Sequence, residues 1–319
     1  MKKLIYIFFL IAVIFPGALV LFLTLRRDAV DSGVSPSASS ENGGKLPVVT
    51  SFYPLYFFAE QIGGDKAEVV NIVPAGAEPH DYEPTAKDVA RMEESRIIIL
   101  NGGGLEAWGD RIEKNTNAGN ATIVVAGEGL LTRETEESGA ATTDPHIWID
   151  PVLAKKMAEK IASGFEAVDP GNAAFYRENA DRLLEELNDL DAAYRKGLQV
   201  CATRNIITSH SAFGYLAAEY GLNQVSIAGL SPDAEPSSAE LARIAQFAKT
   251  NAVRYIFFES LASPKLSQTI ATEVGAKTLV LNPLEGLSDE ELARGEDYFS
   301  VMRDNLVNLQ TALQCNQQR

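Results

Sequence analysis

Residues 169–198, "DPGNAAFYRENADRLLEELNDLDAAYRKGL", decide the fold because they predict one long helix in the middle of the chain. Asp169 and Pro170 supply a start signal, and Gly197 lies near the expected end. Apolar residues recur in steps of three and four, the spacing of one helical face: Tyr176, Ala180, Leu183, Leu187, Leu190, Tyr194 and Leu198. A helix over 172–198 would be roughly 40 Å long at about 1.5 Å per residue. We therefore expect a stiff connection between two parts of the protein.

On both sides of this helix, short apolar runs alternate with helical patterns. The preceding block predicts strands at 46–52, 67–74, 96–104 and 121–127 and helices at 54–64 and 85–95. The following block repeats the alternation from "NIITSH" (205–210) to a final helix near 297–314. Strands of nearly continuous Val and Ile, separated by helices, indicate parallel sheets covered on both faces. We expect an α/β protein with an N-terminal lobe (47–170), a linking helix (171–198) and a C-terminal lobe (199–319).

The first 46 residues differ from the rest in composition. An uncharged apolar run of membrane length covers residues 4–25, between Lys2-Lys3 and Arg26-Arg27. Residues 1–27 are therefore predicted to be a membrane anchor or a signal segment, and the small polar residues 28–46 a flexible tether. The absence of cysteine near position 25 excludes a bacterial lipoprotein anchor.

Charge and cysteine content restrict the partners and the compartment. The chain has 43 acidic and 28 basic residues and a formal net charge of −15. This acidity argues against nucleic acid as a partner and is read chiefly as solubility. Cys201 and Cys315 are the two cysteines, and they either form one disulfide outside the cytoplasm or remain buried thiols.

All three histidines lie at or just beyond the edge of an apolar run. His80 follows "VVNIVPAGAEP", His146 lies in "DPHIWID", and His210 ends "NIITSH". Ligands of α/β proteins bind at the carboxyl ends of strands. More than sixty residues separate each histidine from the next, so only the tertiary fold can bring them together, and we expect them to meet in the cleft between the lobes. Imidazole suits Zn²⁺, which takes about four ligands in a tetrahedron.

A fourth ligand is expected from the second lobe, where three residues are candidates. Glu259 lies in "YIFFES", and Asn282 and Glu285 lie in "LVLNPLEGL". For Glu259, a structural carboxylate that caps the next helix or binds backbone amides is favoured over a metal ligand. Asn282 is neutral and precedes Pro283, which favours a turn, whereas Glu285 offers a free carboxylate in an exposed turn. The residues alone leave the choice open.

Four stretches of the chain, in order and at fitting spacing, resemble a known family. They are "GAEPHDYEPT" (76–85), "DPHIWIDP" (144–151), "IITSHSAFGYLAAEYGL" (206–222) with "SIAGLSPDAEPSSAEL" (226–241), and "VRYIFFES" (253–260) through "TLVLNPLEGL" (278–287). They look like the zinc and manganese substrate-binding proteins of ABC uptake transporters, the ZnuA-like family, over residues 47 to about 315. The resemblance implies two α/β lobes joined by one long rigid helix, with metal held between them at His80, His146 and His210.

Two departures from the family pattern refine the expected site. Many members have an aspartate where this chain has Asn282, but a branch of zinc binders with "NPLEGL" uses the glutamate, so the resemblance points to Glu285. Many zinc members also have a histidine-rich loop before the second ligand, whereas residues 126–145 contain glutamates and no histidine. Three imidazoles and one carboxylate favour Zn²⁺ over Mn²⁺, which prefers more oxygen ligands. Glu83 and Asp144 could orient the rings or could simply lie exposed at the surface.

The resemblance implies a binding protein, not an enzyme, that captures Zn²⁺ in the periplasm or at the cell surface. It would deliver the ion as a membrane-tethered monomer to an ABC permease whose ATPase is a separate chain, since this one has no GxxxxGK[ST] loop. A competing hypothesis is a zinc-dependent hydrolase with an open tri-histidine site and a zinc-bound water. Glu285 discriminates, because a filled fourth position leaves no water to activate. The sequence is also compatible with a manganese-binding member or an adhesin of the same family.

Overall fold

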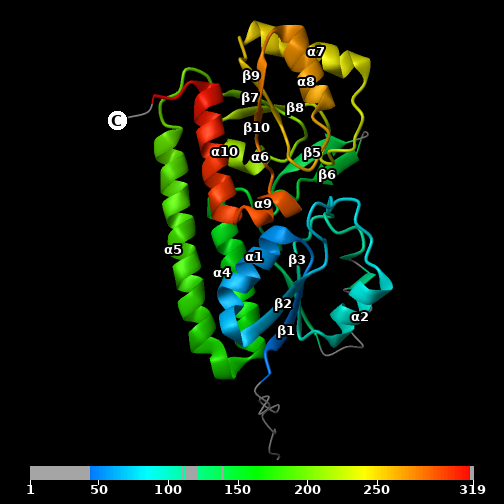
Figure 1. Ribbon diagram of the computed structural model, residues 1–319, viewed down its shortest axis with the longest axis vertical. Helices are drawn as coiled ribbons and strands as arrows, with labels where there is room; N and C mark the ends of the chain where they lie inside the picture. The colour runs from blue at the N-terminus through cyan, green and yellow to red at the C-terminus, as the bar shows by residue number, and fades with distance from the viewer. Residues whose placement is uncertain (1–43, 110, 113–120, 138–139, 317–319) are drawn as a thin grey trace, which may run out of the picture. The chain divides into compact units, whose positions relative to one another are not determined.

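Two parallel four-stranded sheets, each with its own helices, form the two lobes of the chain (Figure 1). The computed structural model describes residues 44–109, 111–112, 121–137 and 140–316. The first lobe contains β1 (Leu46–Thr50), α1 (Tyr53–Gly63), β2 (Ala67–Asn71), α2 (Ala86–Glu94), β3 (Ile97–Leu100) and β4 (Thr122–Val125). The second contains β7 (Asn205–Thr208), α6 (Gly214–Glu219), β8 (Asn223–Ser226), α7 (Ser238–Thr250), β9 (Tyr255–Phe258), α8 (Lys265–Val274), β10 (Lys277–Val280), α9 (Asp289–Ala293) and α10 (Tyr298–Leu313). The prediction of two α/β lobes is confirmed.

The predictions for residues 1–46 concern a segment that the structure describes only from residue 44 on. The predicted anchor (1–27) and the tether up to residue 43 lie outside the described residues, while the last tether position, Leu46, already belongs to β1. Within the described ranges, no helix is long and apolar enough to cross a membrane.

Both sheets have the same strand order, which places ligand-binding loops at equivalent points. The first sheet runs β2-β1-β3-β4 and the second β8-β7-β9-β10, with every adjacent pair parallel. In each lobe the chain goes to one side of its first strand and then crosses to the other. In such sheets ligands tend to bind where the strand order reverses, which here is beyond the carboxyl ends of β1 and β3 and of β7 and β9.

The long helix α5 (Ala173–Gly197) follows the predicted apolar stripe. All seven stripe residues are buried, none more than 4% exposed. Each buried leucine contributes about 1.5–3 kcal/mol from removal of its side chain from water. The helix is one residue shorter at each end than the predicted 172–198, since Asn172 belongs to a short 3₁₀ turn (Pro170–Asn172) and Leu198 caps the C-terminal end. We propose to divide the chain at α5, into lobes of residues 47–170 and 199–319, with the linking helix between them.

A second helix, α4 (Pro151–Val168), packs along α5 and was not predicted (Figure 1). It begins at Asp150, whose side chain accepts a hydrogen bond from the Val152 amide at 2.9 Å. Its buried face, from Ala154 to Phe165, joins one apolar cluster that includes residues of α1, α5 and α10. This shared core connects the lobes, in agreement with a stiff joint.

Two further features complete the fold. The antiparallel hairpin β5 (Glu134–Glu137) and β6 (Ala140–Thr143) lies between β4 and α4 in sequence and was not predicted. Cys201 and Cys315 form a disulfide across 114 residues, which decides between the disulfide and the buried thiols that the sequence left open. The disulfide ties the segment after α5 to the residues after α10.

Candidate metal centre

His80 lies in the loop between β2 and α2, which is fixed at both ends. Near the start of the loop, the Gly76 amide donates to the Leu287 carbonyl of the second lobe at 3.0 Å. At its end, Thr85 caps α2 in a capping box with Asp88, whose carboxylate also accepts from a tyrosine of the loop. The imidazole of His80 is 10% exposed, more than any other side chain of the site.

His146 lies between β6 and α4 and is completely buried. The Asp144 carboxylate accepts hydrogen bonds from the His146 amide (3.0 Å) and from ring atom Nδ1 (2.9 Å). Asp144 is itself only 4% exposed, and of the two residues predicted to orient a histidine ring it is the one that contacts the ring. The other, Glu83, is exposed and forms an ion pair with Arg111 at 2.8 Å, so it is a surface residue and not an orienting one.

His210 lies two residues after β7, and Glu259 directly follows the adjacent strand β9. Glu259 Oε1 accepts a hydrogen bond from His210 Nδ1 at 2.6 Å and another from the Ser209 hydroxyl. The backbone carbonyl of His210 accepts from Thr208 Oγ1 at 2.7 Å, which fixes the turn after the strand. The structure thus gives Glu259 a different role from the predicted helix cap, because its oxygen orients a buried imidazole.

Glu285 follows β10 in a turn held by the Asn282 side chain. Asn282 Oδ1 accepts from the Leu284 amide at 2.8 Å and its Nδ2 donates to Ser260 Oγ at 2.9 Å, so Asn282 forms the turn, as its place before Pro283 suggested. Asn305 in α10 bonds both backbone groups of Asn282, at 2.7 and 2.8 Å. Leu284 has a φ of 58°, an uncommon conformation for a residue with a branched side chain, and the surrounding bonds maintain it. This turn directs the Glu285 carboxylate away from solvent.

The structure brings the three histidines and Glu285 together between the lobes. One ligand atom from each of His80, His146, His210 and Glu285 lies within 4.8 Å of all the others. Glu285 Oε1 is 3.3, 3.2 and 3.0 Å from the Nε2 atoms of the three rings in that order. The Nε2 atom of His146 is 3.2 Å from that of His80 and 3.4 Å from that of His210. Nδ1 of His146 and of His210 faces a carboxylate, so in both rings Nε2 is available to a ligand.

These separations match the edges of a metal coordination tetrahedron. Zn²⁺ binds nitrogen and oxygen ligands at about 2.0–2.1 Å, so two ligands of a regular tetrahedron lie about 3.3–3.4 Å apart. The second oxygen of Glu285, Oε2, is buried without a hydrogen-bond partner in the described part of the chain. A buried carboxylate oxygen without a partner is costly, and a cation beside it would compensate that cost.

The electrostatics of the group favour a cation as well. Burial opposes charge on His210, yet the carboxylates of Glu259 and Glu285 raise its pKa well above 6.5. Burial opposes charge on Glu285 too, but His210 and the hydrogen bonds from the rings hold its pKa well below 4.5. The pKa of His146 is raised by Asp144 and Glu285, again against burial. Glu285 is therefore ionised at neutral pH, and a metal ion would compete with protons for the rings.

Sequence reasoning gave no separate role to Glu78, two residues before His80. Burial, and next the neighbouring charge of Glu285, raise the pKa of Glu78 to about 8. Its Oε1 atom accepts a hydrogen bond from the His80 amide at 3.3 Å. Glu78 is therefore largely protonated at neutral pH and adds little negative charge beside the four converging residues.

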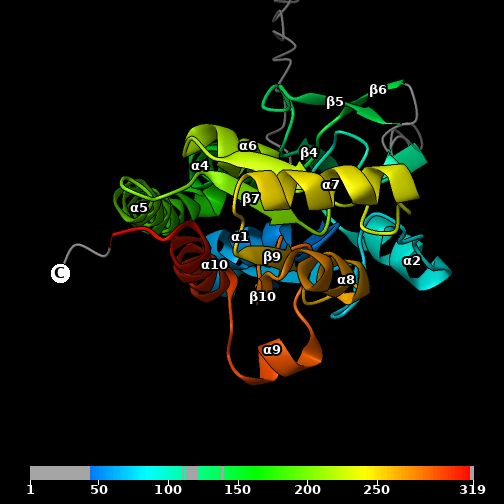
Figure 2. The same cartoon turned by 90° about the horizontal axis from the view of Figure 1, so that it is seen from above.

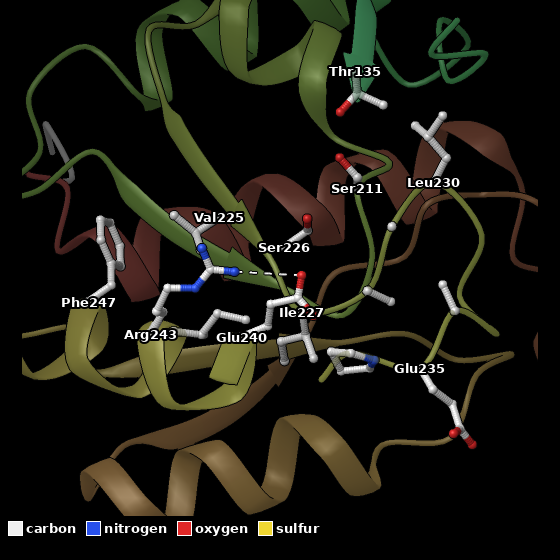
Figure 3. Close-up of a pocket in the computed structure, with 15 residues that line it drawn as sticks. Thr135, Ser211, Val225, Ser226, Ile227, Leu230, Glu235, Glu240, Arg243 and Phe247 are labelled. Carbon is white, nitrogen blue, oxygen red and sulfur yellow. Dashed lines mark ion pairs between the residues drawn. The ribbon is translucent and has the colours of Figure 1, made fainter. Parts of the chain in front are cut away.

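A cavity of about 590 Å³ in the second lobe lies apart from this group (Figure 3). Its lining includes Val225 of β8, Ile227 just after that strand and the Glu240–Arg243 ion pair of α7. Ser211, the neighbour of His210, also lines it, but none of the four converging residues does. Their ligand atoms all lie within 4.8 Å of one another, which leaves space for a bare ion and not for an organic molecule.

The fold and the site together define a two-lobed α/β protein with a candidate metal centre between its lobes. A family model described as the zinc-uptake complex component A, periplasmic (ZnuA), matches residues 48–312. The chain is 42% identical over 294 residues to the high-affinity zinc uptake system protein ZnuA of Bacillus subtilis (strain 168), covering 89% of this chain and 92% of that protein. It is 40% identical to the zinc-binding lipoprotein AdcA of Streptococcus pneumoniae, where the match covers 86% of this chain and 57% of the relative. The chain belongs to the ZnuA family.

Solved structures agree with this assignment. The Zn(II)-bound ZnuA-like domain of Streptococcus pneumoniae AdcA superposes with a TM-score of 0.75 at 40% identity, over 85% of this chain and 99% of that one. The laminin-binding protein Lmb of Streptococcus agalactiae, described as a bifunctional protein with adhesin and metal transporting activity, superposes with a TM-score of 0.77 at 32% identity, over 85% of this chain and 100% of that one.

Proposed function

We propose that this chain captures one Zn²⁺ ion outside the cytoplasm and delivers it to a membrane permease of the ABC type. The observation with the most weight is the spacing of the four converging atoms: five of their six separations are 3.0–3.4 Å, close to the edge of a zinc tetrahedron, and all are within 4.8 Å. Membership of a family described by periplasmic zinc uptake supports the same ion and the same process. The names of the relatives from Bacillus subtilis and Streptococcus pneumoniae support it further.

The proposed ligands are the Nε2 atoms of His80, His146 and His210 and the Oε1 atom of Glu285. Three neutral imidazoles and one carboxylate leave a net charge of +1 on bound Zn²⁺. Nitrogen-rich tetrahedral sites suit Zn²⁺, whereas Mn²⁺ prefers more oxygen ligands. Asp144 and Glu259 increase the basicity of their histidines through Nδ1, as carboxylates behind metal-binding imidazoles do.

Delivery without catalysis is part of this proposal. A catalytic zinc site keeps one position for water, and in this chain the Glu285 carboxylate lies 3.0–3.3 Å from all three rings, where that water would bind. The full-length protein, loaded with zinc, should therefore not hydrolyse a generic ester or peptide. Zinc-dependent hydrolysis that is lost in His210→Ala would overturn this part of the proposal.

Competitive metal titration with elemental analysis tests the choice of ion. The full-length chain is incubated with equal concentrations of Zn²⁺ and Mn²⁺, separated from free metal, and analysed for both. We expect one zinc per chain and almost no manganese, because the ligand set has three nitrogens. Manganese at equal or higher occupancy would overturn the proposal.

We propose a location at the outer face of the cytoplasmic membrane, with the apolar segment 1–27 as the tether. The periplasmic description of the family and the lipoprotein name of a relative support an extracytoplasmic place. The protein would act as a monomer beside its permease. Cell fractionation tests the tether: the full-length chain should stay with the membranes after a high-salt wash, and release into the soluble fraction would refute it.

A further inference from the structure

The segment that contains His146 comes from the first half of the chain but is held by the second lobe. Tyr215, in α6, is the centre of these contacts. Its hydroxyl oxygen accepts hydrogen bonds from the amides of Thr132 (3.0 Å) and Arg133 (2.9 Å), and the hydroxyl donates to the Asp144 carbonyl at 3.1 Å. Residues 132–133 and 144 are the two ends of the β5–β6 hairpin. One buried phenol of the second lobe thus holds both ends of the hairpin.

The side chains around Tyr215 meet at the same aspartate. The Arg133 guanidinium lies over the Tyr215 ring, 5.7 Å from its centroid, and its Nε is 3.6 Å from Asp144 Oδ2. Gly214 allows this close approach, because a Cβ atom there would lie 2.7 Å from Asp144 Oδ2 and 2.8 Å from Arg133 Nε. Asp144 is therefore fixed through its carbonyl and Oδ2 while its Oδ1 binds the imidazole of His146.

The residues after His146 are also bound to the second lobe. Trp148 Nε1 donates to the Pro283 carbonyl at 2.7 Å, and the Tyr298 hydroxyl donates to the Trp148 carbonyl at 2.5 Å. The hairpin lies beside the second lobe in both views (Figures 1 and 2), and Figure 3 shows Thr135 of β5 on the same side of the cavity as Ser211. The contacts to the second lobe thus lie on both sides of His146 in the sequence.

We propose that Tyr215 is a positioning residue for the metal ligand His146. Its hydroxyl docks the base of the hairpin on α6, sets the place of Asp144 behind the imidazole, and so keeps His146 assembled with His210 and Glu285 of the second lobe. The inference rests on the zinc site proposed above, and it adds the residue through which the second lobe controls a ligand of the first.

Zinc affinity of Tyr215→Phe in the full-length chain tests this role. The substitution keeps the ring under Arg133 and removes only the hydroxyl, so the two ends of the hairpin, one of which contains Asp144, lose their common anchor. Changes behind a metal ligand typically weaken binding about 10- to 100-fold, and we expect about a 10-fold rise in the dissociation constant for Zn²⁺. The visible absorption of bound Co²⁺ should change as well, because it reports the coordination geometry.

Tyr220→Phe is the matched control. Tyr220 is similarly buried, lies under Arg195 with 5.7 Å to the ring centroid, and donates to an Asp191 carboxylate oxygen at 2.9 Å, away from the hairpin. It should change the zinc dissociation constant by less than about twofold. A loss of affinity equal to that of Tyr215→Phe would show a general effect of the phenols and overturn the inference.

Gly214→Ala gives a second, independent variant in which the Tyr215 hydroxyl is intact. Its new Cβ displaces Asp144, so zinc affinity should again fall about 10-fold, and this variant decides the outcome if Tyr215→Phe does not fold. Thermal unfolding of the zinc-free variants separates the roles: a lower midpoint with unchanged zinc affinity and Co²⁺ spectrum would overturn the inference and leave the zinc site standing. Failure of the unmodified chain to bind zinc would overturn the proposed function itself.

Discussion

Replacing Glu285 by alanine should weaken zinc binding much more than the same change at Glu259. Glu285 Oε1 is 3.0–3.3 Å from the three imidazole Nε2 atoms, so its removal takes away one of four ligands and the anionic one. Glu259 instead contacts His210 from behind, through Nδ1 at 2.6 Å, and its removal leaves all four ligands in place. The two carboxylates are both buried, which makes them a matched pair.

The expected loss of zinc affinity is larger for Glu285→Ala than for Glu259→Ala. Truncation of a carboxylate behind a ligand costs about 10- to 100-fold in affinity, or about 1.4–2.7 kcal/mol. Loss of one partner of a buried charge pair costs about 3–5 kcal/mol, so Glu285→Ala should lower zinc affinity by roughly 10²- to 10³-fold or more. Competition with a chelator of known zinc affinity measures both variants, and thermal unfolding of the zinc-free forms checks that they fold. Equal losses, or a greater loss for Glu259→Ala, would refute the assignment of Glu285 as a ligand.

Three further predictions concern protons and the disulfide. Zinc binding at pH 7 should release about one proton or more. Burial opposes charge on His210, but Glu259 and Glu285 raise its pKa well above 6.5, and the metal displaces the proton that the ring carries. Calorimetry in buffers of different ionisation enthalpy should detect the released proton, and zinc binding without proton release would contradict this prediction. Glu78→Gln should stabilise the zinc-free chain at pH 7 by at most about 3 kcal/mol and have no effect below about pH 4.5. Burial raises the pKa of Glu78 in the folded chain to about 8, so its carboxyl group lowers the free energy of unfolding only above the pKa it has in the unfolded chain. Denaturant unfolding at the two pH values tests this, and the same stabilisation at both would refute it. Reduction of the Cys201–Cys315 disulfide should lower the free energy of unfolding by about 2–4 kcal/mol, because the disulfide closes a loop of 114 residues. The reduced chain should still bind one zinc ion. An unchanged denaturation midpoint after reduction would contradict this prediction.

Local periodicity made most of the fold predictable. The stripe from Tyr176 to Leu198 placed α5 to within one residue at each end, since a helix that buries one face must repeat every three or four residues. The strands were found because parallel strands covered on both faces are continuous runs of apolar residues, as in Ile97–Leu100. The α4 helix has the same kind of signal, from Ala154 to Phe165, and was predictable in principle. The hairpin 134–143 was not, because its strands are polar and have no apolar alternation.

The converging residues of the candidate site were predictable from the sequence, but the carboxylates behind the histidines were only partly so. The three histidines and Glu285 follow apolar runs or recognisable turns, and the resemblance selected Glu285 among the candidates. The carboxylate behind His210 could not be chosen, because Glu259 is 49 residues away and becomes its neighbour only when β9 pairs with β7. Asp144 was found because it is two residues from its histidine, whereas Glu83, also close to His80 in sequence, points to Arg111 at the surface.

X-ray absorption at the zinc edge of the zinc-loaded, full-length chain tests the central claim most directly. The spectrum reports the number, type and distance of atoms bound to the ion. We predict a four-coordinate shell of three imidazole nitrogens and one carboxylate oxygen at about 2.0–2.1 Å, and a loss of one imidazole in His210→Ala. A shell of five or six oxygen-rich ligands, or one that keeps three imidazoles in His210→Ala, would contradict the binding of zinc by His80, His146, His210 and Glu285.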